Sequence, residues 1–150
     1  METQSTLTRR TARVRCSYGL ACEVEHEDRS LRVDLPRDQG GGATGPHPAQ
    51  LMRASLGSCL LMGYKLWAER LGIALQNVEL ELSCDFDERG QLGLDDTVAV
   101  GWSRVVIDAT FHSTASDAEI TRLVEVAHRH NPMLANLAEH IAREIHVRRA

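Results

Sequence analysis

The stretch PAQLMRASLGSCLLMGYKLWAERL, residues 48–71, decides how this chain folds. Pro48 suits the first turn of a helix, and Gly72 suits the position just after its end. The stretch therefore predicts one helix, about 36 Å long at the usual rise per residue. Between Ala54 and Gly63 it is apolar or small on every side, whereas a surface helix carries charge on one side. We expect this middle section to be buried all round.

The segments before this helix alternate as β-strands do. Between residues 12 and 35, apolar and polar residues alternate in three runs, and turn-forming residues at 18–19 and 27–30 separate the runs. This pattern predicts a three-stranded meander. The following run, PRDQGGGATGPHP at 36–48, contains too much glycine and proline for regular structure and predicts an adaptable loop.

Two strands are predicted after the long helix. Residues 77–87 alternate strictly between apolar and polar side chains, and residues 105–111 repeat the pattern. The residues between them, beginning with ERGQLGLDD at 88–96, read as a polar linker.

The last third of the chain predicts helices and a final strand. Ser116 with Glu119 forms a capping box that starts a helix, and its apolar face continues at the helical period to Asn131. Pro132 ends this helix, residues 133–142 predict a short further helical piece, and residues 145–147 suggest a strand. The order βββαββααβ is typical of the α+β class, because strands and helices do not alternate strictly.

Composition and charge favour one globular domain. The chain has 150 residues, of which 43% are hydrophobic and 25% charged, so we expect a single domain over 1–150 with a flexible N-terminus at 1–11. The net charge of −4 argues against a nucleic-acid partner. No apolar run approaches the ~18 residues that span a membrane, and the first residues do not read as a signal peptide. We therefore expect a cytoplasmic protein that binds neither nucleic acid nor membrane.

A helix that is apolar on all sides needs more cover than six short strands of one subunit can supply. The simplest solution is a twofold homodimer that packs the central helices of two copies together.

The residues themselves offer one candidate for chemistry, which is Cys59 in the middle of the apolar helix. A free cysteine is more often a small buried side chain, and a thiolate would need a nearby cation, base or helix N-terminus. Cys16, Cys22 and Cys84 read as core or strand-surface residues. The seven histidines are scattered, so no metal site is expected, and no dinucleotide, phosphate-loop or nucleophile-elbow motif is present.

Three stretches resemble the OsmC/Ohr family of osmotically induced and organic hydroperoxide resistance proteins. They are GATGPHPAQLMRASLGSCLLMGYKLWAERLGI at 42–73, NVELELSCDFD at 77–87 and AHRHNPMLANLA at 127–138. The resemblance extends over about 14–147. It implies an intertwined α+β homodimer, in which two long central helices are wrapped by antiparallel sheets from both subunits.

The resemblance also implies roles for single residues. In active members a helix cysteine, matched here by Cys59, attacks the O–O bond of an organic hydroperoxide, and a second cysteine resolves the sulfenic acid as a disulfide. Asn131 stands at the second position. Ala49 stands where the family has the Glu that holds an activating Arg, and Arg37 or Arg15 is the candidate for that Arg. The resemblance therefore implies a divergent member that lacks the second cysteine.

Two functions follow from these residues. The first is a peroxidase that uses Cys59 alone, with Arg37 as activator, an external dithiol as reductant and no cofactor. The second is a dimeric module that has lost the redox chemistry and holds a small apolar ligand. In both cases we expect a pocket beside Cys59, and its predicted members are His47, Ala49, Ser55, Met62 and Asn131.

Overall fold

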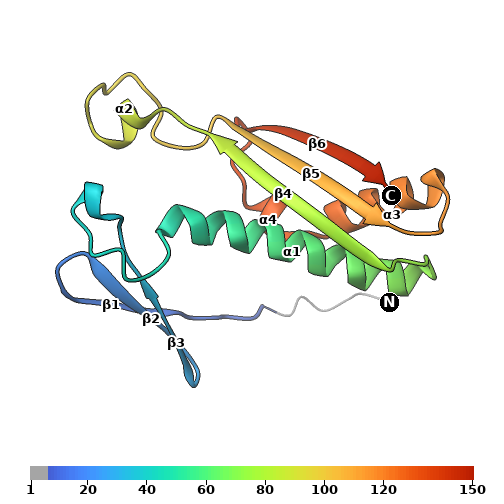
Figure 1. Cartoon of the computed structure of the whole chain (residues 1–150), viewed down its shortest axis with the longest axis horizontal. Coiled ribbons are helices and arrows are strands. Elements are labelled where there is room, and N and C mark those ends of the chain that lie inside the picture. Colours follow the sequence, from blue (N-terminus) through green and yellow to red (C-terminus); the bar gives the residue numbers. More distant parts are fainter. Residues whose placement is uncertain (1–6) are drawn as a thin grey trace. The chain divides into compact units, whose positions relative to one another are not determined.

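The computed structural model describes residues 7–150, apart from the side chains of Ser17 and Tyr18. The chain forms two compact units, Met1–Met52 and Arg53–Ala150, and Figure 1 shows the elements of each. Of the predicted flexible segment 1–11, residues 1–6 lie outside the described part, and residues 7–11 carry no regular structure. The mixture of helices and sheets confirms the α+β class, while the single domain stays a prediction.

The first unit contains the predicted meander. Its strands are β1 (Arg13–Tyr18), β2 (Ala21–His26) and β3 (Arg29–Val33), and they form an antiparallel sheet in the order β1-β2-β3. The prediction of three alternating strands is confirmed.

A buried carboxylate, which the sequence analysis missed, organises the glycine-rich loop after β3. Asp34 accepts hydrogen bonds from the backbone N–H groups of Leu35 (2.8 Å), Gly42 (3.1 Å) and Thr44 (3.0 Å), and from the Thr44 hydroxyl (2.6 Å). Its side chain is buried. The loop also holds the short helical turn η1 (Arg37–Gln39). The segment predicted as adaptable is therefore anchored at its centre.

Close backbone contacts explain two of the glycines in this loop. A Cβ on Gly41 would collide with the carbonyl of Leu35, and a Cβ on Gly45 would collide with the carbonyl of Arg32. Any other residue at these positions would force the backbone itself to shift.

The long helix α1 (Pro48–Leu71) has the bounds that the sequence predicts. At its start the His47 ring nitrogen Nδ1 accepts a hydrogen bond from the Ala49 N–H (3.0 Å), and the His47 N–H donates to Gln50 Oε1 (2.8 Å). These reciprocal bonds satisfy helix-terminal donors as a capping box does. His47 thus has a structural task at the N-terminus of α1.

The sheet of the second unit combines the predicted strands in mixed directions. Strand β4 (Asn77–Asp85) pairs antiparallel with β5 (Arg104–His112), and β5 pairs parallel with β6 (Ala142–Arg149). Strand β5 is therefore central, and its alternate residues are buried.

Helix α3 (Asp117–Arg129) starts at the predicted capping box, in which Ser116 Oγ accepts from the Glu119 N–H and Glu119 Oε2 accepts from the Ser116 N–H. The helix α4 (Pro132–Ala135) follows directly. The predicted helical piece at 133–142 is therefore too long, because the chain turns after Ala135 and enters β6.

Two further predictions need correction. Residues 86–103 were expected to be irregular apart from the end of a strand, but they contain the short helix α2 (Glu88–Gln91), which the Asp87 side chain caps. The strand predicted to run to residue 87 ends at Asp85, and Phe86 is 40% exposed rather than part of the apolar face.

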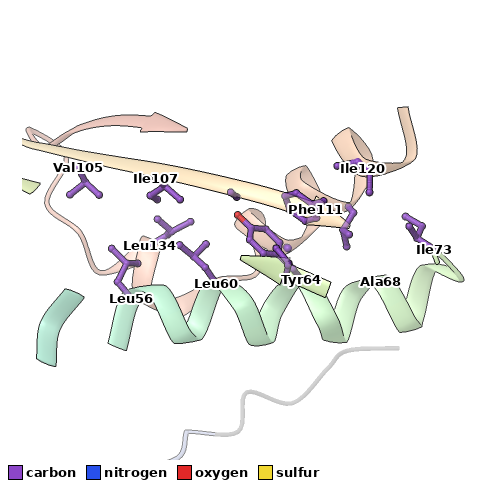
Figure 2. Packing of buried hydrophobic residues seen from close by; sticks show 14 of the residues in the cluster. Leu56, Leu60, Tyr64, Ala68, Ile73, Val105, Ile107, Phe111, Ile120 and Leu134 are labelled. Carbon is purple, nitrogen blue, oxygen red and sulfur yellow. The ribbon is translucent and has the colours of Figure 1, made fainter. Parts of the chain in front are cut away.

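The core of the second unit lies between α1, β5 and α3 (Figure 2). Tyr64 points from α1 toward β5 and contacts Phe111 edge-on, with ring centroids 5.0 Å apart. The most deeply buried large side chains are Tyr64, Phe111, Leu56, Leu60, Ile107, Leu123 and Val105.

The second unit buries one side of α1. Its buried residues, which form one stripe, are Leu56, Gly57, Leu60, Tyr64 and Ala68. Ala54, Ser55 and Ser58 are exposed, and Met62 is 65% exposed. The second unit covers one side of the middle of the helix. Burial of the other sides, which the sequence analysis assigns to a second copy of the chain, stays a prediction.

A polar pair lies within this core. The Tyr64 hydroxyl and His128 Nε2 are 2.6 Å apart. Burial raises the pKa of Tyr64 and lowers the pKa of His128, so both groups stay uncharged and share one hydrogen bond.

We expect Asp34→Asn to loosen the glycine-rich loop, because the Asn amide would place donors against the donors of Gly42 and Thr44. The Thr44 hydroxyl, with the backbone N–H groups, lowers the pKa of Asp34. The carboxylate therefore stabilises the loop above its unfolded pKa of about 3.9, and this stabilisation disappears as the pH falls through the lower folded value.

The measurement is the hydrogen-exchange protection of the Gly42 and Thr44 amides. Wild-type protection should be high at about pH 7 and decline below about pH 4, while the variant should be poorly protected throughout. Equal protection of the two proteins near neutrality would contradict the role given to Asp34.

Tyr64→Phe should lower the free energy of unfolding by about 1 kcal/mol, because His128 Nε2 loses its hydrogen-bond partner in the core. The pKa of His128 should remain low in the variant, since burial is its cause. A lowered His pKa destabilises the fold as the pH drops through the unfolded value of about 6.5, because the unfolded chain then binds the extra proton. Urea denaturation above that pH and an NMR titration of His128 test both statements, and an unchanged stability would contradict the first.

Candidate functional site

Cys59 lies on a stripe of α1 that borders the buried one. It is half-buried, and the residues three, four, seven and eight positions further along the helix share its side. These are Met62, Gly63, Leu66 and Trp67. Because Gly63 has no side chain, this stripe is hollow just after Cys59.

Asn131 faces this hollow from the turn between α3 and α4. Its Oδ1 accepts a hydrogen bond from the Leu134 N–H (2.9 Å) and so caps α4, which identifies Nδ2 as the amide nitrogen on the other side. Nδ2 lies 3.9 Å from the position that a Cβ on Gly63 would take. Asn131 was predicted on the face of the preceding helix, but that helix ends at Arg129. Its burial, to 3% exposure, comes from the cap instead.

Together these elements line an open cavity of about 210 Å³. Its lining residues are Cys59, Met62, Gly63, Leu66, Trp67, Ala127, His130, Asn131 and Pro132. Within the described part of the chain this lining contains no Asp, Glu, Lys or Arg. The cavity thus offers a thiol, a carboxamide and an imidazole on otherwise apolar walls.

One end of the cavity is aromatic. The rings of Trp67 and His130 stack with centroids 4.8 Å apart and an angle of 25° between their planes. The guanidinium of Arg70 lies over the Trp67 ring, 4.9 Å from its centroid, in a cation–π contact. The stack joins the end of α3 to α1.

Another cysteine of the second unit has an arginine neighbour. Arg53 Nη1 lies 3.7 Å from the Sγ atom of Cys84 on β4. Cys84 is half-buried and does not line the cavity of Cys59.

The structure brings together three of the predicted site residues. Cys59, Met62 and Asn131 line one cavity, whereas Ser55 is exposed on α1 and does not. His47 and Ala49 form the N-terminal cap of α1 in the first unit. Their predicted roles in a pocket stay predictions.

The two arginine candidates also belong to the first unit. Arg15 Nη1 lies 3.1 Å from Glu25 Oε1, in an ion pair on the surface of the sheet. Arg37 is exposed in the η1 turn. A role of either guanidinium at Cys59 stays a prediction.

Sequence reasoning missed Trp67 and His130. The helical spacing from Cys59 points to Trp67, eight residues on, and to Gly63 and Leu66 before it. His130 precedes Asn131 and could have been found only by placing the end of one helix against another, which no local pattern predicts.

Two kinds of site are absent from residues 7–150. No group of three or more His, Cys, Asp or Glu side chains is arranged to hold a metal ion. No helix in this range is both long and apolar enough to cross a membrane.

Solved structures share this fold over almost the whole chain. An OsmC-like protein from Mycoplasma pneumoniae matches with a TM-score of 0.76 at 14% identity, covering 95% of this chain and 99% of that one. A protein from Legionella pneumophila, described as an organic hydroperoxide resistance protein OsmC and predicted redox protein, matches with a TM-score of 0.70 at 19% identity, covering 96% and 99%. At these identities the likeness shows the fold.

The sequence comparisons point the same way. A protein of Haloferax volcanii, described as uncharacterized, is 28% identical over 120 residues, which is 77% of this chain and 80% of its own length. The family model described as OsmC-like protein matches residues 40–146, which include α1, the cavity residues and most of β6. The chain therefore belongs to the family of OsmC-like proteins.

Proposed function

We propose that this protein reduces organic hydroperoxides through the thiol of Cys59. The observation that carries the proposal is the position of this thiol on an apolar cavity beside a buried carboxamide. The thiolate of Cys59 attacks the terminal oxygen of R–O–O–H, and the O–O bond breaks. Sulfur takes the OH group as a sulfenic acid, and the alkoxide leaves and takes up a proton to give the alcohol.

Asn131 is suited to assist this step by hydrogen bonding. Its Oδ1 is occupied by the Leu134 N–H, so the orientation of the amide is set and Nδ2 is turned toward Gly63 and the cavity. An amide N–H can donate to the peroxide oxygen on which negative charge develops. Apolar walls suit the organic part of the hydroperoxide, because they bury its surface from water.

Regeneration of Cys59 requires an external dithiol. Asn131 occupies the position at which active relatives are expected to have a second cysteine, and a carboxamide cannot form a disulfide. One thiol of the dithiol attacks the sulfenic sulfur and releases water, which leaves a mixed disulfide. The second thiol then attacks the outer sulfur, so that the dithiol leaves as a cyclic disulfide and Cys59 regains its thiol. No cofactor takes part.

The proposal includes an activating cation for Cys59, because a thiolate in apolar surroundings needs one. The lining of the cavity supplies no guanidinium or ammonium from the described residues. Arg37 is the candidate, since it is exposed, whereas Arg15 already pairs with Glu25.

The site is proposed to work in a homodimer. The side of α1 that the single chain leaves exposed carries Ala54, Ser55, Ser58 and Met62, which are small or apolar. Met62 and Leu66 are also cavity residues, and they are 65% and 45% exposed. A second copy packed on this side would cover them and close the cavity, which would exclude water from the thiol.

A second candidate function is supported by the same walls. The lining holds no charged side chain within residues 7–150, and Ala49 stands where a carboxylate would hold the activating arginine. Both features suit a dimeric module that binds a small apolar ligand beside Cys59 without redox chemistry.

With cumene hydroperoxide and dithiothreitol, the rate of peroxide consumption should be higher with the wild-type protein than in buffer alone. With Cys59→Ser the rate should fall to that of buffer, because the nucleophile is lost. Loss of peroxide is followed by a colorimetric assay. Cys84→Ser is the matched control, because it removes another half-buried thiol of the same unit outside the cavity. It should retain the wild-type rate.

If wild type and Cys59→Ser consume peroxide equally, the peroxidase proposal is wrong. The binding function would then be supported by a rise in melting temperature with a medium-chain fatty acid that Gly63→Leu abolishes, since a leucine at this position would fill the cavity.

The dimer is tested by Ser55→Glu, which places a charge on the exposed side of α1. Burial of an unpaired carboxylate is costly, so the sedimentation coefficient should fall from that of a dimer to that of a single chain. Arg122→Glu on the exposed side of α3 is the matched control and should leave the dimer intact. A wild-type protein that sediments as one chain would contradict the dimer.

A further inference from the structure

The N-terminal sheet places two cysteines directly opposite each other. Cys16 on β1 and Cys22 on β2 are register partners in an antiparallel pair. Side chains of such partners lie on the same side of the sheet, with Cβ atoms about 4.5–5.5 Å apart. Both thiols also point toward the turn that joins the strands, because Cys16 Sγ donates to the Gly19 carbonyl (3.2 Å) and Cys22 Sγ to the Leu20 carbonyl (3.9 Å).

This spacing suits a disulfide bond. Opposite residues of an antiparallel pair have Cα atoms about 4.5 or 5.5 Å apart, depending on the type of pair. Both values lie in the range of about 4.4–6.8 Å that disulfides occupy. A register shift in β1 lies beside the pair, between Cys16 and Tyr18. A bond between the two sulfurs also requires Cβ atoms about 3.5–4.5 Å apart, so the two strands must approach slightly at this pair.

The pair is also accessible to reagents in solution. Cys16 is exposed and Cys22 is half-buried, and neither belongs to the core of the second unit. The pKa of Cys22 is raised, first by the neighbouring Cys16 thiol, and further by burial and by the nearby charge of Asp34. Cys16 is the more exposed of the two cysteines and is therefore the thiol that meets a reagent first.

We propose that Cys16 and Cys22 form a redox-active dithiol that exchanges with small organic disulfides of the glutathione type. The thiolate of Cys16 attacks one sulfur of R–S–S–R, which forms a mixed disulfide and releases the first thiol, RSH, after protonation. Cys22 then loses its proton to water and attacks the Cys16 sulfur, which releases the second RSH. The net reaction converts the protein dithiol and RSSR into the protein disulfide and two RSH.

This inference does not depend on the proposed peroxidase. It rests on the register and exposure of two residues of the first unit, and Cys59 takes no part in it. The same chemistry run in reverse, with an excess of RSH, restores the dithiol, so the pair is a reversible reporter of the surrounding thiol-disulfide ratio.

The experiment uses the full-length protein and its Cys59→Ser variant, equilibrated in buffers of reduced and oxidised glutathione and then blocked with a maleimide. Trypsin releases both cysteines in one peptide, CSYGLACEVEHEDR at 16–29. As the share of oxidised glutathione rises, mass spectrometry should show this peptide lighter by two hydrogen atoms and without maleimide or glutathione. The result should be the same in both proteins.

A matched control moves one thiol to the other side of the sheet. Cys22→Ser combined with Glu23→Cys keeps two cysteines in the same peptide, but adjacent strand residues point to opposite sides. The internal disulfide should then be about tenfold less abundant, with glutathione adducts in its place, because the two sulfurs cannot meet. Cys16→Ser, which keeps the native Cys22, should give only the glutathione adduct at Cys22.

Two outcomes would overturn the proposal. One is a wild-type peptide that carries two glutathione groups or two maleimides at every glutathione ratio. The other is an internal disulfide that forms equally in the control with the displaced thiol, since the reaction would then not depend on the register of β1 and β2.

Discussion

The second unit depends on the contact between one side of α1 and the inner side of β5. Leu60 and Tyr64 from the helix meet Ile107 and Phe111 from the central strand, and each of these four side chains is fully buried. Burial of this apolar surface is the main favourable contribution to folding, at about 25 cal/mol for each Å² removed from water. The same contact determines which residues of α1 border it. Cys59 lies beside the buried stripe and is therefore held at the edge of the core, half-buried, next to the end of α3.

Local signals explain how much of the fold could be predicted. The meander, the bounds of α1, strands β4 and β5 and the capping box at Ser116 depend on periodicity and on caps, which are written in consecutive residues. The parallel pairing of β6, the helix α2 and the anchor at Asp34 depend on contacts between distant residues. The exposed side of α1 is apolar or small in composition, which predicts further cover, and that cover stays a prediction.

The candidate site divides in the same way. Cys59, Met62 and Asn131 were found from one helix pattern and from a family resemblance, and the structure places them on one cavity. Trp67 lay within reach of the same helical spacing, whereas the stacking of His130 on it required the turn before α4. The predicted pocket residues His47 and Ala49 cap the start of α1, and a pattern of residue types does not distinguish capping from a binding role.

The loop anchored by Asp34 bears on how this protein can vary during evolution. A stretch without helix or strand is usually the place where a chain accepts insertions and exchanges most freely. Here the backbone passes so close to itself at Gly41 and Gly45 that no side chain fits. The carboxylate of Asp34 accepts hydrogen bonds from backbone N–H groups of the same loop, those of Gly42 and Thr44. The loop should therefore tolerate fewer substitutions than the exposed residues of β1, β2 and β3. In a random mutagenesis library selected for folded protein, variants in this loop should be lost before variants at those exposed strand positions.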